Sequence, residues 1–186
     1  MTTYTSIQLV ERPHGGPIGP DLFNVVEQPI PECADGEFLI KQTHMSLDPA
    51  MLGWMSPDTE SYIPPVELGT TMRGSGVGEV VASKHSDYAV GDKVMGMFGW
   101  TEYALSKGQG VNKLDAQVDP EIALSVFALP GLTATQGLYR IGQPKAGETL
   151  VVSGAAGSVG SIVGQLAKAD GLRVIGVAGG QEKCDW

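Results

Sequence analysis

The stretch that decides the fold runs from Thr149 to Lys183 and reads TLVVSGAAGSVGSIVGQLAKADGLRVIGVAGGQEK. It begins with a short β-branched run that predicts a buried strand. Three glycines follow with G-x-x-G-x-x-G spacing, at Gly154, Gly157 and Gly160. Apolar residues then recur at helical spacing, and a second β-branched run at 173–177 predicts another strand. The order strand, glycine turn, helix, strand predicts a βαβ unit.

Glycines between a strand and a helix suit the binding of a dinucleotide. They permit a tight turn and let the backbone approach a pyrophosphate, while the helix N-terminus offers unpaired N–H groups and a positive dipole end. The sequence therefore predicts a dinucleotide site. The alternative is that the glycines serve close packing alone, and we expect the lack of a side chain at Gly160 and Gly164 to let the helix lie close to the strands.

The end of the second strand favours NADP(H) over NAD(H). An NAD site usually has Asp or Glu there, about 20 residues after the glycines. Here the strand ends in VAGG at 177–180, and Gln181-Glu182-Lys183 follows. Lys183 stands where a 2′-phosphate would lie, although a lysine on a loop is often only solvated.

The composition is that of a globular protein and excludes several partners. Among 186 residues, 42% are hydrophobic and 18% charged, and 12 basic against 21 acidic residues give a net charge of −9. Such an acidic chain without a basic cluster argues against nucleic acid or a membrane surface as partner. No apolar run is long enough to span a membrane. The two separated cysteines and the lack of a secretory signal predict a cytoplasmic protein.

Residues 1–118 predict an all-β, barrel-like domain, because short strand candidates are separated repeatedly by Pro and Gly. These candidates are 7–10, 23–26, 37–42, 78–81, 93–97 and 101–105. Pro64-Pro65 and the glycines of 74–78 predict bends. The 74–78 run precedes a strand rather than a helix, so it is not expected to bind phosphate.

Residues 119–186 predict linking helices and the start of a Rossmann domain. Asp119-Pro120-Glu121 is typical of a helix start. Helices are expected over 122–129 and 132–141, with a break at Pro130-Gly131. A Rossmann sheet usually has about six parallel strands, whereas this sequence supplies two. We therefore expect the chain to be the front portion of a longer enzyme.

Five motifs in order carry a family resemblance: RPHG at 12–15, SLDP at 46–49, LPGLTA at 129–134, SGAAGSVG at 153–160 and AGGQEKC at 178–184. With them the chain resembles the medium-chain dehydrogenase/reductase superfamily. Within it, the similarity is to the zinc-independent leukotriene hydroxydehydrogenase/prostaglandin reductase branch of NADPH-dependent enone reductases, which includes the curcumin reductases. The resemblance implies a mixed α and β fold, a GroES-like β-barrel domain followed by the first part of a Rossmann domain.

The resemblance also implies roles for particular residues. The pyrophosphate would be held by Gly157, Ser158, Val159 and Gly160, and the 2′-phosphate by Lys183, with Gly179 beside it in the cofactor site. Leu129 and Thr133 would lie near the nicotinamide, and Asp48, Ala50 and Met51 would line the substrate pocket. The alternatives are a simple turn at Asp48-Pro49 and a Thr133 hydroxyl bonded to its own helix backbone.

The substrate-pocket motif departs from that of its relatives. Relatives commonly read Asp-Pro-Tyr-Met-Arg where this chain has Asp48-Pro49-Ala50-Met51-Leu52. Small or apolar side chains therefore replace a Tyr and an Arg, and Leu129 replaces a usual Met. An apolar pocket predicts an apolar substrate, and the resemblance implies that this substrate is a small unsaturated carbonyl compound.

Zinc is not expected. A catalytic zinc needs about three protein ligands and a structural one usually four Cys or His. The three histidines, His14, His44 and His85, are scattered, and Cys33 and Cys184 stand alone. Zinc-dependent relatives carry Gly-His-Glu before the glycine bend, where this chain has Thr71-Met72-Arg73-Gly74.

The implied reaction is NADPH-dependent reduction of a carbon–carbon double bond conjugated to a carbonyl, by hydride transfer to the β-carbon. No catalytic residue is assigned, and the proton donor is expected beyond Trp186. One alternative is a zinc-independent quinone oxidoreductase of the same superfamily. Another is a folded fragment that neither binds cofactor tightly nor catalyses, with a homodimer as one way to bury its open sheet edge.

Overall fold

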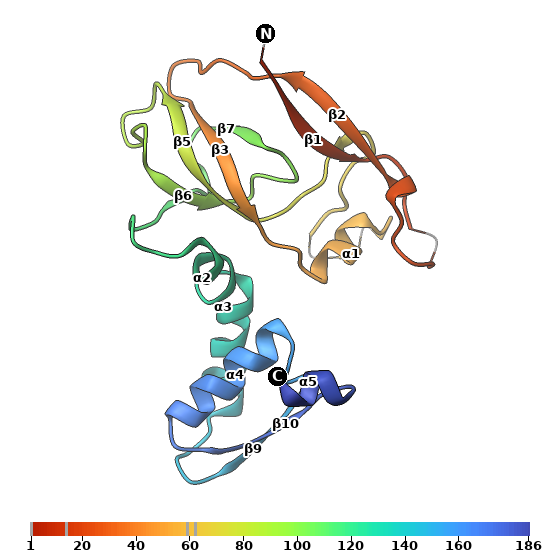
Figure 1. Cartoon of the computed structure of the whole chain (residues 1–186), viewed down its shortest axis with the longest axis vertical. Helices are drawn as coiled ribbons and strands as arrows, with labels where there is room; N and C mark the ends of the chain where they lie inside the picture. Colours follow the sequence, from red (N-terminus) through yellow and green to blue (C-terminus); the bar gives the residue numbers. More distant parts are fainter. Residues whose placement is uncertain (1, 14, 59, 62) are drawn as a thin grey trace. The chain divides into compact units, whose positions relative to one another are not determined.

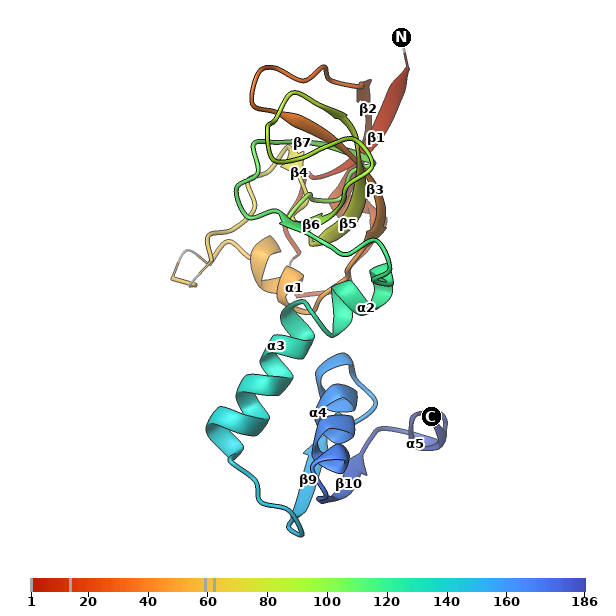
Figure 2. The same cartoon turned by 90° about the vertical axis from the view of Figure 1, so that its left-hand side faces the viewer.

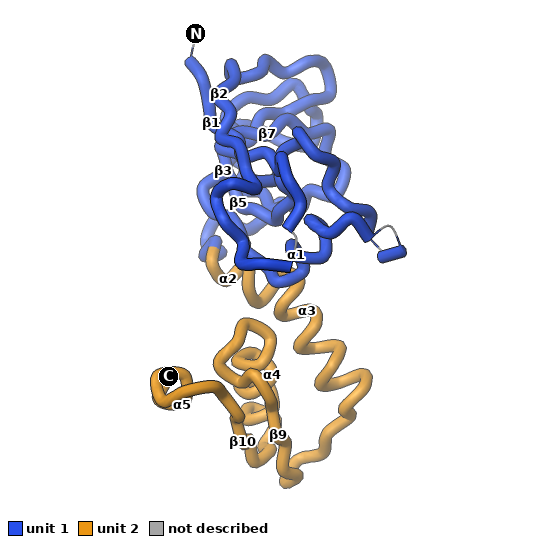
Figure 3. Tube along the Cα trace, turned by 90° about the vertical axis from the view of Figure 1, so that its right-hand side faces the viewer, with its two compact units in different colours: residues 1–120 blue, residues 121–186 orange. Residues whose placement is uncertain are grey.

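The structure is a computed structural model that describes residues 2–13, 15–58, 60–61 and 63–186. The chain divides into two compact units, unit 1 (Met1–Pro120) and unit 2 (Glu121–Trp186) (Figure 3). Across the part of the chain that the structure describes, every helix is too short or too polar to span a bilayer.

Unit 1 is built from antiparallel strands in two sheets (Figure 1). The smaller sheet has the order β2-β1-β4, with β1 Thr3–Leu9, β2 Phe23–Pro29 and β4 Thr70–Thr71. A 3₁₀ turn, η1 (Pro20–Leu22), leads into β2. The larger sheet has the order β7-β3-β5-β6-β8, with β3 Phe38–Met45, β5 Gly76–Ser83, β6 Lys93–Gly96, β7 Tyr103–Ser106 and β8 Asn112–Lys113. An isolated antiparallel bridge pairs Ser6 of β1 with Thr101, just before β7.

Two apolar clusters form the core of unit 1. Alternate residues of the larger sheet point inward, so Phe38, Ile40, Val80 and Val94 are all fully buried. Tyr88 covers Phe38 with its ring stacked at 4.1 Å between centroids. The second cluster joins β1 to the short helix α1 (Ala50–Met55) through Leu9, Leu22, Met51, Trp54, Met55, Val66 and Met72.

The structure confirms the β-rich N-terminal architecture and corrects one detail. Gly76 and Gly78 lie inside β5 and do not form the expected bend. Glycine is needed there because a Cβ at residue 78 would lie 2.6 Å from Cγ2 of Ile40 and 3.0 Å from Cα of Gln42. The pairing of β3 with β5 is also irregular between Gln42 and His44. Close approach of two strands, and not a turn, therefore accounts for these glycines.

Unit 2 contains the expected βαβ unit. Its elements are α2 (Pro120–Ser125, whose first residue closes unit 1), α3 (Leu129–Thr135), the π-helical turn η2 (Gln136–Gly142), β9 (Thr149–Ser153), α4 (Ser158–Ala169), β10 (Arg173–Val177) and α5 (Gln181–Asp185). Strands β9 and β10 are parallel, with Thr149 opposite Arg173 and Ser153 opposite Val177. Helix α4 lies over this pair and also contacts α3 (Figure 2). Leu138, Ala167 and Leu172 form the buried centre.

The helix boundaries differ from those expected in the linking region. Pro130 and Gly131 do not break a helix; they lie in the first turn of α3, where a proline needs no N–H partner. Gly131 is required because a Cβ there would lie 2.6 Å from the carbonyl carbon of Val126. The expected helix 132–141 begins earlier, and its second half is the π-helical η2. This turn ends at Gly142, and its C-cap, Gln143, has a left-handed φ of 46°.

Candidate dinucleotide-binding site

The glycine turn joins β9 to α4 through a short loop. Gly154 has a φ of +60°, and Gly157 is the N-cap of α4. The N–H of Gly157 donates to the carbonyl of Gly154 at 2.9 Å, which closes the turn. The N–H of Ala155 donates to the carbonyl of Val177 at 3.1 Å. The loop is therefore held against the end of β10.

The two helix glycines differ in the space around them. A Cβ at Gly160 would lie 2.9 Å from Cα of Ala155 and 3.0 Å from the carbonyl carbon of Gly154, both backbone atoms. Any side chain there would push the helix away from the loop. A Cβ at Gly164 would make an ordinary contact of 3.8 Å with Cγ1 of Val174. Close packing of α4 against the loop thus requires glycine at residue 160. The expectation that close packing against the strands also requires glycine at residue 164 is wrong.

The first turn of α4 suits an anion. The N–H groups of Ser158, Val159 and Gly160 lie in the first turn, where no carbonyl of the helix can accept from them. The dipole of this 12-residue helix is positive at the same end. The first turn contains no acidic residue. The Ser161 hydroxyl donates to the carbonyl of Ser158 at 3.1 Å, so it is already engaged by its own helix. The turn therefore offers mainly backbone donors, as a pyrophosphate site requires.

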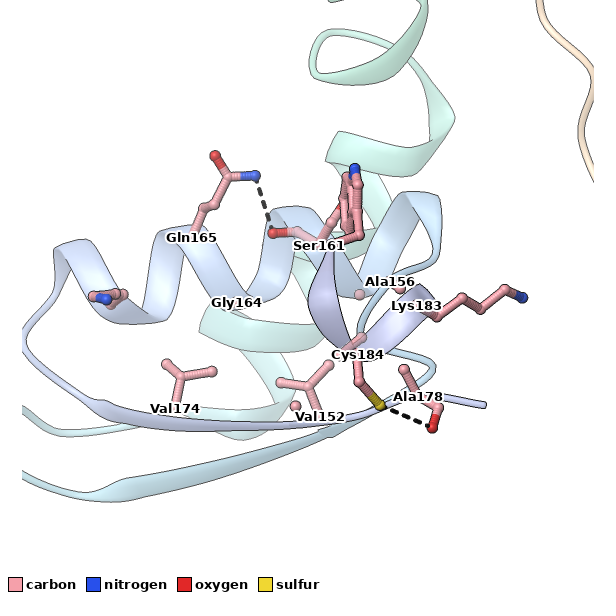
Figure 4. Close-up of a pocket in the computed structure, with 14 residues that line it drawn as sticks. Val152, Ala156, Ser161, Gly164, Gln165, Val174, Ala178, Lys183 and Cys184 are labelled. Atoms are coloured by element: carbon pink, nitrogen blue, oxygen red, sulfur yellow. Dashed lines mark hydrogen bonds between the residues drawn. The ribbon is translucent and has the colours of Figure 1, made fainter. Parts of the chain in front are cut away.

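The end of β10 lacks a carboxylate. Ala178 and Gly179 follow the strand, and Gly180, with a φ of +86°, begins α5. The Lys183 side chain extends from α5 away from Gly164 and Gln165 of α4 (Figure 4). Among the described residues, none bonds or pairs with its ammonium group. The Lys183 ammonium group is therefore available to donate hydrogen bonds to a phosphate.

A hollow of about 700 Å³ lies along the flank of α4. Its lining includes Gly160 and Lys183 from the predicted cofactor residues, together with Val152, Val174, Gln165 and Cys184 (Figure 4). Ser158, Val159 and Gly179 do not line it. The hollow therefore touches the glycine turn at Ala155, Ala156 and Gly160 but includes only two of the predicted cofactor residues, Gly160 and Lys183. Sequence reasoning did not predict it, because it arises where α4, β10 and α5 meet.

Leu129 and Thr133 lie on α3, and both side chains are exposed. The alternative for Thr133 is a hydroxyl bonded to its own helix backbone. Such a bond is made by Thr135, whose hydroxyl donates to the carbonyl of Gly131. Within the described chain, the hydroxyl of Thr133 has no such bond. The expected place of both residues near a nicotinamide stays a prediction.

The predicted substrate-pocket residues belong to unit 1 and begin α1. The carbonyl of Asp48 accepts from the N–H of Met51 at 3.0 Å, so Asp48-Pro49 starts a helix and is not a simple turn. Met51 is only 4% exposed and packs in the core beside Trp54. Leu52, by contrast, is 53% exposed. The apolar surface of α1 available to a small molecule thus comes from Leu52 and the partly buried Ala50, and a pocket role for Met51 stays a prediction.

The two described histidines and both cysteines have local partners. His44 Nδ1 is 3.0 Å from the Thr43 hydroxyl, and His85 Nδ1 accepts from the N–H of Asp87 at 3.0 Å. The thiols of Cys33 and Cys184 face backbone carbonyls. His14 lies outside the described residues. Among the residues that are described, no group of three or more His, Cys, Asp or Glu could hold a metal ion.

Comparison with known proteins finds similarity to oxidoreductases over most of the chain. A model of the family described as the N-terminal domain of oxidoreductase matches residues 5–114. The NADPH-dependent curcumin reductase of Escherichia coli (strain K12) is 49% identical over 177 residues, 95% of this chain and 51% of that protein. Prostaglandin reductase 1 of Bos taurus is 38% identical over 161 residues, 84% of this chain and 46% of that protein.

Among solved structures, the crystal structure of CurA in complex with NADPH from Vibrio vulnificus has a TM-score of 0.89 at 45% identity. The match covers 97% of this chain and 53% of that one. The chain thus spans about half the length of the relatives it matches.

Proposed function

We propose that the protein reduces a carbon–carbon double bond conjugated to a carbonyl, with NADPH as hydride donor. The premise is that this chain belongs to the oxidoreductase family that its N-terminal domain matches. Within the medium-chain dehydrogenase/reductase superfamily, it belongs to the zinc-independent enone reductase branch. The observation that carries the proposal is the glycine turn before α4, combined with the lack of a carboxylate at 177–180 and the presence of Lys183 in α5. The names of the relatives, an NADPH-dependent curcumin reductase and a prostaglandin reductase, support the same cofactor and substrate class.

Each cofactor residue has a physical task in this proposal. The backbone N–H groups of Ser158, Val159 and Gly160 bind the pyrophosphate, and Gly157 keeps the approach to them open. Lys183 pairs with the 2′-phosphate, and Gly179 leaves room beside the ribose. Leu129 and Thr133 border the nicotinamide. When bound, NADPH supplies the hydride that the β-carbon receives.

The substrate is proposed to be a small, apolar, unsaturated carbonyl compound. Ala50 and Leu52 offer apolar contact, and Asp48 and Met51 fix the start of α1 from which they project. Reduction leaves an enolate, whose oxygen needs positioned hydrogen-bond donors because no metal is proposed. We assign no proton donor to the described residues. A cytoplasmic location and a homodimer belong to the proposal as well; two free cysteines are consistent with a reducing compartment.

The test is a titration of the protein with NADPH and with NADH, followed by calorimetry. We expect Lys183→Ala to weaken NADPH binding about tenfold or more at low salt, since a hydrogen bond to a charged group contributes about 1.5–3 kcal/mol. NADH binding is expected to stay unchanged. Lys168→Ala is the matched control, because Lys168 also lines the hollow but lies in the last turn of α4.

Equal affinity for the two cofactors, or equal loss in both variants, would contradict the proposed 2′-phosphate contact. A panel of enones and quinones then separates the substrate classes. Faster reduction of quinones would move the protein to the quinone oxidoreductase group. Binding of neither cofactor would describe a folded chain that is not competent alone.

A further inference from the structure

The side chain of Arg12 joins backbone carbonyls from two separate segments. Its Nη1 donates to the carbonyl of Met55 at 2.8 Å and to that of Ser56 at 3.3 Å, and its Nη2 donates to the carbonyl of Val66 at 2.8 Å. The first two carbonyls lie at the C-terminal end of α1, where a helix leaves carbonyls unpaired and a cation is favourable. Arg12 therefore caps α1 and ties it to the segment that returns at Val66.

Two further contacts hold the same half of α1. The N–H of Val66 donates to the carbonyl of Trp54 at 2.8 Å. The guanidinium of Arg73 lies 5.5 Å from the centroid of the Trp54 ring, and its Nη1 donates to the carbonyl of Pro64 at 3.1 Å. The N-terminal end of the helix, by contrast, begins at Pro49 without a side-chain cap. A helix of 6 residues is not stable alone, so these tertiary contacts decide where it lies.

We propose that Arg12 is a positioning residue for the substrate: it fixes α1 and thereby sets where Ala50 and Leu52 are presented. This inference rests on the proposed function, in which α1 contributes to the substrate pocket. It also gives a task to Arg12-Pro13, a motif that cofactor binding leaves without a role. Arginine is required because two nitrogens of one planar group reach carbonyls of different segments, whereas the single ammonium of lysine cannot reproduce this fork.

The experiment compares the wild-type protein with Arg12→Lys, which keeps the charge and leaves in place the bond from the Val66 N–H to Trp54 and the contacts of Arg73. Hydrogen exchange is measured in peptides covering 50–56, and binding and reduction are measured with benzylideneacetone, a small apolar enone. We expect exchange in 50–56 to become at least tenfold faster and the KM for the enone to rise at least tenfold. The kcat and the affinity for NADPH are expected to stay within twofold of wild type, because the glycine turn lies in unit 2.

Lys93→Met is the control for a general loss of stability. The Lys93 ammonium also donates to two carbonyls, those of Ala116 and Val118, each at 2.8 Å, but to none on α1 or Val66. We expect this variant to leave exchange in 50–56 and the enone KM unchanged. Should Arg12→Lys not fold, Arg73→Lys loosens α1 through Trp54 and is measured in the same way.

Unchanged exchange in 50–56 in the Arg12 variant would overturn the inference, as would faster exchange with an unchanged enone KM. An equal rise of KM in the Lys93 variant would overturn it too, because the effect would then be one of overall stability. A wild-type protein that binds no enone would instead overturn the proposed function and, with it, the substrate part of this inference. The exchange data alone would still show whether Arg12 fixes α1.

Discussion

The pair Gly160→Ala and Gly164→Ala tests the glycine turn with one chemical change at two positions of α4. In a helix interior, alanine is about 1 kcal/mol more favourable than glycine. At residue 164 the new methyl group makes an ordinary 3.8 Å contact with Val174, so this gain is kept. We expect Gly164→Ala to stabilise unit 2 by about 0.5–1 kcal/mol.

At residue 160 the same methyl group meets backbone, 2.9 Å from Cα of Ala155 and 3.0 Å from the carbonyl carbon of Gly154. Backbone atoms cannot rotate away as a side chain would, so the helix or the loop must move. Overpacking of this kind costs about 1–3 kcal/mol. The gain in helix propensity offsets part of this cost, and we expect Gly160→Ala to destabilise unit 2 by about 1–2 kcal/mol.

The assay is the free energy of local opening from hydrogen exchange in peptides of 149–177, which reports on unit 2 separately from unit 1. NADPH titration of the same variants provides the functional readout. Gly160→Ala is expected to weaken NADPH binding because the helix start moves relative to the loop, whereas Gly164→Ala is expected to leave it unchanged. Equal stability of the two variants, or a Gly160→Ala protein that binds NADPH as tightly as wild type, would refute the reasoning.

Two predictions concern stability elsewhere. Gln143, the C-cap of η2, has a left-handed φ of 46°, a conformation that costs a non-glycine residue about 1 kcal/mol. Gln143→Gly is therefore expected to raise the free energy of unfolding of unit 2 by up to about that amount, measured by urea unfolding. A lower free energy of unfolding in the variant would contradict this prediction. The Lys113 ammonium, 2.6 Å from Asp92, and the N–H of Ala89 lower the pKa of the Asp92 carboxyl. Because the folded pKa lies below the unfolded one, this stabilisation is present above about pH 4 and is lost as the pH falls through the folded value. The melting temperature of unit 1 should therefore fall less on acidification in Asp92→Asn than in wild type, and parallel curves would exclude a contribution from this carboxyl.

The sequence predicts the βαβ unit well because its signals are local. A β-branched run, a glycine turn and a helical apolar pattern lie within 35 consecutive residues, and all three are read without knowledge of distant contacts. The lack of a carboxylate at 177–180, the end of the second strand, is likewise visible in the local sequence.

Other features depend on contacts between distant residues and could not be predicted. Gly76 looks like a turn residue, yet it lies in β5, where a Cβ would come within 3.1 Å of the carbonyl oxygen of His44, far away in the sequence. Helix α1 is too short to show a periodic pattern, and its main support comes from Arg12 and Val66. The burial of Met51 follows from the same packing. At these positions the sequence shows which residue is present, but it does not show which distant residues that residue contacts.

The proposed cofactor contacts and the support of α1 belong to different units. The glycine turn, the α4 N-terminus and Lys183 all lie in unit 2, whereas Arg12, α1 and Val66 lie in unit 1. Each set of substitutions lies within its own unit, and we expect their free-energy effects to add. The double variant Arg12→Lys/Lys183→Ala should therefore combine the loss in enone affinity with the loss in NADPH affinity. A loss larger than the product of the two would mean that bound NADPH and α1 act on each other, and the substrate pocket would then depend on the cofactor.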